Sequence, residues 1–229
     1  DQRWPSMDTL LEALADDPAQ RRRRFAGVAL VIALLAGLAG GALWSAMLMP
    51  TIGLLMALQP SVAQLHGGER FAEAGAITRQ GFWIALALCL PFFVVIHQGG
   101  RLLGWMAVDE AIIPVAVDYL QALAWGAPMI CMTLFLRFYS EGTGHTRPTM
   151  YIGLLGALLN IPFNWVLMFG HLGFPALGAR GCGYATSAVL GLQALAMAAY
   201  VRRHAHYEPF ELFARWDWPE GREIRELLR

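Results

Sequence analysis

The chain has 229 residues, of which 57% are hydrophobic and 15% are charged, and its formal net charge is zero. Soluble domains average about 25% charged residues, so this composition excludes an ordinary soluble domain, and a neutral chain with scattered arginines gives no reason to expect a nucleic-acid partner. Long stretches without Asp, Glu or Arg, each reaching the roughly 20 residues that cross a bilayer, predict a polytopic all-α membrane protein.

The first predicted element is a cytoplasmic segment, residues 1–24. Residues 8–16 form a short amphipathic pattern, with three leucines on one helical face. Four consecutive arginines at 21–24 then precede an apolar run. Such a basic group before a span indicates a cytoplasmic side under the positive-inside rule.

The next stretch, residues 25–68, contains no Asp, Glu or Arg and would be about 66 Å long as one helix. The hydrocarbon core is about 30 Å thick. The stretch is therefore either two spans with a tight turn near Gly40 and Gly41, or one long helix that projects beyond the membrane. Arg70 and Arg79 indicate that the following loop is also cytoplasmic. An even number of crossings is then required, which favours two spans, at 25–42 and 45–65.

Four further predicted spans bring the total to about six, in a bundle over residues 25–206. Arginines flank the connector at 137–147 and follow the last span, so both ends of the chain are expected in the cytoplasm. Residues 207–229 alternate aromatic and charged side chains, which is typical of an interfacial tail on the bilayer. The remaining spans are expected at 81–98, 115–136, 149–170 and 182–201.

Several polar side chains lie inside these apolar runs and are candidates for a cavity, because unpartnered polar groups are costly in hydrocarbon. The cysteines are isolated, the histidines have no metal-ligand spacing, and no catalytic set is found, so neither a metal site nor an enzyme is expected. The candidates are Gln59, Gln64, Asn160, Asn164 and Thr186.

Four motifs, in order, resemble the multidrug and toxic compound extrusion (MATE) family in its bacterial multidrug-efflux branch. They are GLLMALQPSVAQLHG at 53–67, EGTGHTRPTMYIG at 141–153, NIPFNW at 160–165 and PALGARGCGYATS at 175–187. The resemblance covers about residues 43–229. It implies a parent with twelve spans in two pseudo-symmetric lobes, of which this chain supplies the second to sixth spans and is a fragment.

The resemblance also implies a function and a site. The parent would be an antiporter in the bacterial inner membrane that exports organic, often cationic, drug-like compounds in exchange for H⁺ or Na⁺, with no bound cofactor. Asn160, Asn164 and Thr186 would line the cavity of the lobe, although amides can also join two helices and Thr186 can bond its own helix. Pore lining and helix pairing are equally expected for Gln59 and Gln64. The acidic residue of the family's first span has no counterpart in residues 25–42.

The first 42 residues depart from the family and resemble the end of a bacterial membrane-anchored Ser/Thr protein kinase, through RWPSM at 3–7, the arginines and one apolar run. Without the second lobe, the chain is expected not to transport alone. Two alternatives are a membrane-anchored, kinase-derived regulatory fragment and a half-size transporter that works as a homodimer, with a second copy in place of the missing lobe.

Overall fold

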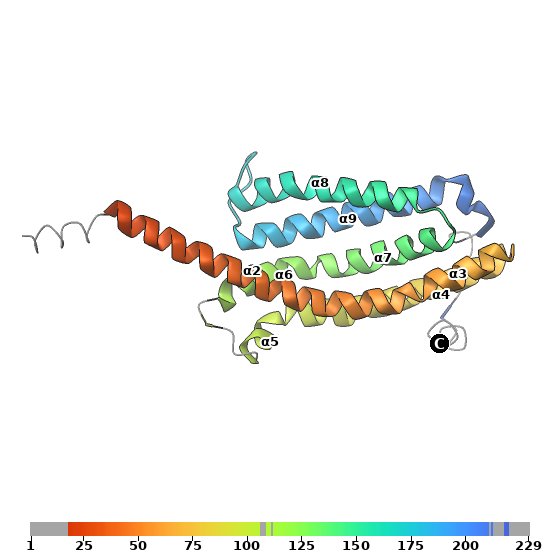
Figure 1. The fold of residues 1–229 in the computed structure, drawn as a ribbon, viewed down its shortest axis with the longest axis horizontal. Coiled ribbons are helices and arrows are strands. Elements are labelled where there is room, and N and C mark those ends of the chain that lie inside the picture. The colour runs from red at the N-terminus through yellow and green to blue at the C-terminus, as the bar shows by residue number, and fades with distance from the viewer. Residues whose placement is uncertain (1–17, 106–108, 111, 211, 213–217, 220–229) are drawn as a thin grey trace, which may run out of the picture.

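The computed structural model describes residues 18–105, 109–110, 112–210, 212 and 218–219. Every regular element in these ranges is a helix, which confirms the predicted all-α fold. The helices run alongside one another, with α8 and α9 on one side of the bundle and α2 and α4 on the other (Figure 1). They are α2 (Pro18–Met56), α3 (Leu58–Gly67), α4 (Phe71–His97), α5 (Gly99–Trp105), α6 (Ile113–Ala124), α7 (Gly126–Gly142), α8 (Arg147–Phe169), α9 (Ala179–Arg203) and the 3₁₀ helix η1 (Ala205–Phe210).

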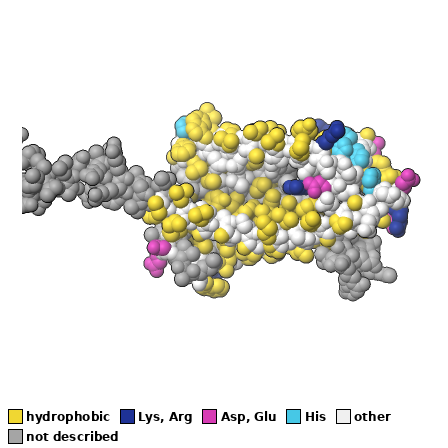
Figure 2. All heavy atoms as spheres, in the orientation of Figure 1, with side chains coloured by type: hydrophobic (Ala, Val, Ile, Leu, Met, Phe, Trp, Pro, Cys, Tyr) yellow, Lys and Arg dark blue, Asp and Glu magenta, His cyan; other side chains and the backbone are white. Residues whose placement is uncertain are grey.

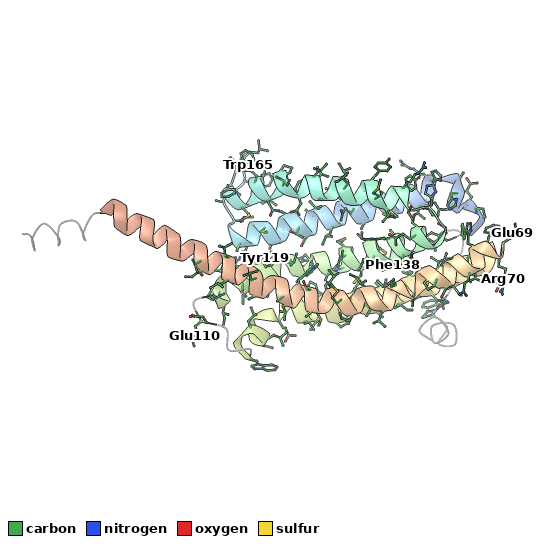
Figure 3. The ribbon with its side chains drawn as sticks, viewed as in Figure 1. Glu69, Arg70, Glu110, Tyr119, Phe138 and Trp165 are labelled. Carbon is green, nitrogen blue, oxygen red and sulfur yellow. The ribbon has the colours of Figure 1, made fainter. Side chains whose placement is uncertain are left out.

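Helix α2 is continuous through Gly40 and Gly41, so the predicted turn at this pair is wrong. A Cβ at Gly40 would lie 2.9 Å from the ring of Tyr119, so this glycine lets α6 approach α2 closely. A turn at membrane depth would also leave backbone groups without partners. Because α2 and α3 run on in one direction, the start of α2 and Arg70 lie at opposite ends of the molecule (Figures 1 and 3). The charge pattern predicts that residues 21–24 and Arg70 lie on the same side of the membrane, and the backbone does not agree with this (Figure 1).

Two prolines mark the breaks between consecutive helices. A proline ring clashes with the carbonyl group four residues earlier and has no N–H to donate. Four residues before Pro60 is Met56, the last residue of α2, and four residues before Pro128 is Ala124, the last residue of α6. The second break bends α6 against α7 by 49°.

Four helical stretches of the described residues are long and apolar enough to cross a membrane, and the bent pair α6 and α7 makes a possible fifth. The prediction of about six spans differs from this result because it divides residues 25–68 into two spans, whereas the structure has one helical stretch there. The four are Leu34–Gly67, Phe71–His97, Arg147–Phe169 and Ala179–Arg203.

The surface and the packing fit a membrane bundle. Apolar side chains cover much of the visible surface, whereas most of the visible arginine and histidine side chains lie toward one end and acidic side chains lie at both ends (Figure 2). Glycines allow close helix contacts inside: a Cβ at Gly183 would lie 2.6 Å from the carbonyl oxygen of Tyr119, between α9 and α6. We call the end that carries Arg70, Arg147 and the end of α9 the arginine-rich end.

The segment after α9 packs into the bundle, which corrects the expectation that everything beyond 206 is interfacial. Tyr207 and Phe210 of η1 are 3% and 1% exposed. Further along, the ring of Trp218 stacks on Trp83, with centroids 6.2 Å apart. The predicted elements at 8–16 and 220–229, and Trp216, lie outside the described residues.

Candidate functional site

Asn160 and Asn164 lie one turn apart on α8 and are hydrogen-bonded. The Nδ2 of Asn164 donates to the Oδ1 of Asn160 at 2.6 Å and to its backbone oxygen at 2.9 Å. Pro162 between them has no N–H, so the carbonyl group of Leu158 loses its helical donor. Both asparagines are half-buried. The helix therefore gathers several polar atoms within an apolar segment.

The Oδ1 of Asn164 is buried and has no hydrogen-bond partner within the described part of the chain. An unsatisfied buried polar atom costs about 1–3 kcal/mol. The amide nitrogen of Asn164 is already engaged, so the side chain offers only oxygen lone pairs. Such an atom can be satisfied by an N–H donor or by a cation, and it is the strongest sign of a ligand site on this helix.

Two adjoining grooves open between α7, α8 and α9 toward the arginine-rich end. Their volumes are about 460 and 150 Å³. Both are lined by Arg137, Thr149 and Gly153. The larger groove is completed by Glu141, Thr146, Arg147, Met150 and Leu154, and the smaller by Ile130, Thr133, Leu134, Ile152, Gln193 and Met197.

One face of α8 connects these grooves with the asparagine pair. Thr149, Gly153, Gly156, Asn160 and Asn164 follow one another at intervals of four, three, four and four residues. Such spacings place side chains on a single helical face. The Oγ1 of Thr149 is also buried without a partner among the described residues. A stripe of small and polar residues, which we call the α8 stripe, thus runs from the grooves to the pair.

Gln193 of α9 was not among the predicted site residues. Its Nε2 donates long hydrogen bonds of 3.4 Å to the backbone oxygens of Ile152 and Gly153. A Cβ at Gly156 would lie 1.8 Å from this Nε2, so the glycine makes room for the amide. A single amide in an apolar run was the available signal, but its partner helix was not evident from the sequence.

The predicted residues do not all lie together. Thr186 is half-buried on α9, which packs against α8, and precedes Gln193 by two turns. Gln59 and Gln64 lie on α3, which packs against α4 and α7, and the side chain of Gln64 is exposed. Figure 3 shows the end of α3 at the end of the bundle opposite to Trp165 of α8. The structure therefore does not bring these glutamines to the asparagine pair.

The ion pairs near these helices join carboxylates to arginines. The Nε of Arg137 lies 2.7 Å from Glu141, and Arg180 lies 2.7 Å from Asp118. Within the described ranges, no group of three or more His, Cys, Asp or Glu is placed to hold a metal ion. The chemistry of the asparagine pair is that of neutral oxygen acceptors.

Comparison with known proteins shows which family contains these features. The MatE family profile matches residues 31–166, so the match begins earlier than the boundary near residue 43 that we expected. The multidrug resistance protein PmpM of Pseudomonas aeruginosa is 37% identical over 190 residues, which are 82% of this chain and 40% of the relative. The multidrug resistance protein NorM of Aliivibrio fischeri is 36% identical over 178 residues, 78% of this chain and 39% of the relative. The chain spans about two fifths of the length of these curated relatives.

Solved structures of MATE transporters have a similar fold. The MATE transporter NorM-NG, in a complex that includes a monobody, is 29% identical with a TM-score of 0.63, covering 88% of this chain and 46% of that chain. An inward-facing multidrug resistance MATE transporter, at 20% identity and a TM-score of 0.69, shares the fold over 84% of this chain and 44% of its own. Because the profile covers 136 of the 229 residues, the chain belongs to the MatE family, whose members are transporters and not enzymes.

Proposed function

We propose that this chain forms one lobe of a cation-coupled multidrug antiporter in a bacterial cytoplasmic membrane, which exports organic, often cationic, compounds. The observation that carries the proposal is the buried, unpartnered Oδ1 of Asn164 at the end of the α8 stripe. The names of the relatives, which are multidrug resistance proteins, support the substrate class.

The stripe suits an exchange of two ligands. The oxygens of Asn160 and Asn164 can accept from the N–H groups of an organic cation or coordinate a small cation. One acceptor set cannot serve both at once, so substrate and coupling ion would exclude each other. Export then requires that each ligand bind the two conformations of the transporter with different affinity.

The amides bear on the choice of coupling ion, H⁺ or Na⁺. An asparagine side chain does not titrate, so the pair itself holds no exchangeable proton. Its oxygens are ligands of the kind that hard cations take. In this proposal the pair therefore binds Na⁺ or the substrate, and coupling to protons would depend on a carboxylate outside α8.

In this proposal the chain is inactive alone, because alternating access needs two lobes that move against each other. It is tested by accumulation of a fluorescent organic cation in bacteria that lack their own exporters. Cells that express this chain alone should accumulate as much of the fluorescent cation as cells without the chain. Cells that co-express it with the C-terminal half of PmpM should accumulate less.

In the paired format, Asn164→Leu should restore accumulation, whereas Gln121→Leu, which changes an exposed amide on α6, should not. Export by the chain alone, together with cross-linked dimers, would instead support the half-size transporter. If the Asn164→Leu variant exports as well as the wild type, Asn164 is not part of the binding site. If the chain neither pairs nor exports, the anchored regulatory fragment becomes the better explanation.

A further inference from the structure

Four histidines meet at the arginine-rich end, away from the asparagine pair of α8. They come from α3 (His66), from the turn between α7 and α8 (His145) and from the segment after α9 (His204 and His206). The ring of His145 lies 4.8 Å from that of His206 and 5.0 Å from that of His204, between centroids. His66 lies 5.9 Å from His206. Figure 2 shows histidine side chains gathered at this end.

The cluster lies where η1 docks on the bundle. The hydroxyl group of Tyr207 lies 2.5 Å from the Oγ of Ser140, which also donates to the backbone oxygen of His145. Phe210 contacts the rings of Tyr139 and His66 at centroid distances of 5.8 and 5.6 Å. η1 thus covers the ends of α3 and α7.

Helix α4 is shaped for the same contact. A Cβ at Gly75 would lie 2.0 Å from the backbone oxygen of Phe210, so only glycine fits under η1 at this position. Since Phe210 is 1% exposed, η1 is an integral part of this end of the bundle and not a loose connection.

The docked arrangement disfavours protonation of His145 and His206. The backbone N–H of His206 donates to the Nδ1 of His204 at 3.3 Å, and this nitrogen accepts only while it carries no proton. Burial, followed by the nearby His145, lowers the pKa of His206 below its ordinary 6.5. Burial, followed by His204 and Arg147, lowers the pKa of His145 in the same way.

A backbone hydrogen bond to Thr143 favours a charged His206, but its effect is smaller than those of burial and of His145. The Nδ1 of His66 and the Nε2 of His206 are buried without a hydrogen-bond partner in the described residues. The carboxylate of Glu141 on α7 is paired with Arg137, and Glu208 of η1 is exposed. The other titratable and charged groups around the cluster are Arg147 of α8, Tyr139 of α7, Tyr200 of α9 and Tyr207 of η1, besides the histidines themselves.

We propose that this histidine cluster forms a pH-sensitive latch, which holds η1 on the bundle while His145 and His206 are neutral and releases it when these two rings take up protons. The undocked segment binds protons more readily than the docked one, so the docked state is fully stable above about pH 6.5 and is lost as the pH falls further. Release uncovers the ends of α3, α4 and α7. The latch does not depend on which substrate the protein carries.

Hydrogen exchange of the amides at 205–210 tests the latch. The whole chain in lipid nanodiscs is measured at pH 7.5 and 5.5, with each rate corrected for the intrinsic pH dependence of exchange. Protection should fall by about tenfold or more at pH 5.5, since one pKa unit corresponds to a factor of ten. The double variant His145→Gln and His206→Gln should keep its protection at both pH values. His171→Gln, at the other end of the bundle beside Trp165, should behave as wild type.

Equal corrected protection at both pH values in the wild type would overturn the latch, and so would a loss of protection in the double variant that equals the wild-type loss. If the double variant does not dock at pH 7.5, the histidine titrations of the wild type decide. The ¹³C-labelled resonances of His145 and His206 should titrate over the pH range in which protection is lost, and titration over a different range would refute the proposal.

Discussion

Replacement of Gly181 by alanine tests the contact between α8 and α9 that positions the α8 stripe. The new Cβ would lie 2.4 Å from the backbone oxygen of Leu167 and 2.6 Å from its carbonyl carbon. Helix backbone cannot rotate away as a side chain can, so the two helices must separate. Overpacking of this kind costs about 1–3 kcal/mol, and we expect a value in the upper half of that range.

Substitutions at two other glycines of α8 and α9 serve as comparisons for the loss of stability. At Gly156 the new Cβ meets only the flexible end of Gln193, whose two long hydrogen bonds would be lost at about 0.6 kcal/mol each, or about 1 kcal/mol together. At Gly191 the nearest atoms belong to Met129 at 3.8 Å, an ordinary contact. Gly191→Ala should therefore be neutral, or stabilising by up to about 1 kcal/mol through helix propensity.

The assay is unfolding of the purified chain by SDS titration in mixed micelles, followed by circular dichroism. The expected order of destabilisation is Gly181→Ala, then Gly156→Ala, then Gly191→Ala. If Gly181→Ala is no less stable than Gly191→Ala, the close contact between α8 and α9 is absent and the position of the α8 stripe is wrong.

Three further predictions use the same preparation. Gly75→Ala would place a Cβ 2.0 Å from the backbone oxygen of Phe210, so η1 should undock and limited proteolysis after α9 should be faster than in wild type. Ser187→Ala removes a hydrogen bond of 3.0 Å to the backbone oxygen of Ala122 and should cost about 0.6 kcal/mol in SDS titration. Because burial lowers the pKa of His206, the unfolded chain binds more protons below about pH 6.5, so the unfolding free energy should fall between pH 7.5 and 5.5, and less in His206→Gln.

The fold class could be predicted because hydropathy is a local property of the chain. The error at Gly40 and Gly41 has a clear cause: the same dipeptide suits a turn or a close helix contact, and only the ring of Tyr119 on a distant helix distinguishes them. For this reason the first two predicted spans become one helix. The burial of Tyr207 and Phe210 was also missed, since it depends on surfaces that α3, α4, α7 and α9 supply.

The candidate site could be predicted only in part. The spacing of Asn160 and Asn164 indicates a shared face, and the structure joins them by a hydrogen bond. Gln193 depends on the register of α9 against α8, which single-helix periodicity does not contain. Gln59 and Gln64 share the residue type of the site, but α3 packs elsewhere.

The most direct test of the central claim is equilibrium binding of a fluorescent organic cation to the chain in nanodiscs, with Na⁺ as competitor. The wild type should bind the dye, Na⁺ should displace it, and Asn164→Leu should weaken binding by at least about tenfold, as expected for the loss of a hydrogen bond to a charged group of about 1.5–3 kcal/mol. Gln121→Leu should bind as wild type does. Equal affinity of the wild type and Asn164→Leu, or binding that Na⁺ does not affect, would contradict the assignment of the α8 stripe as the cation and substrate site.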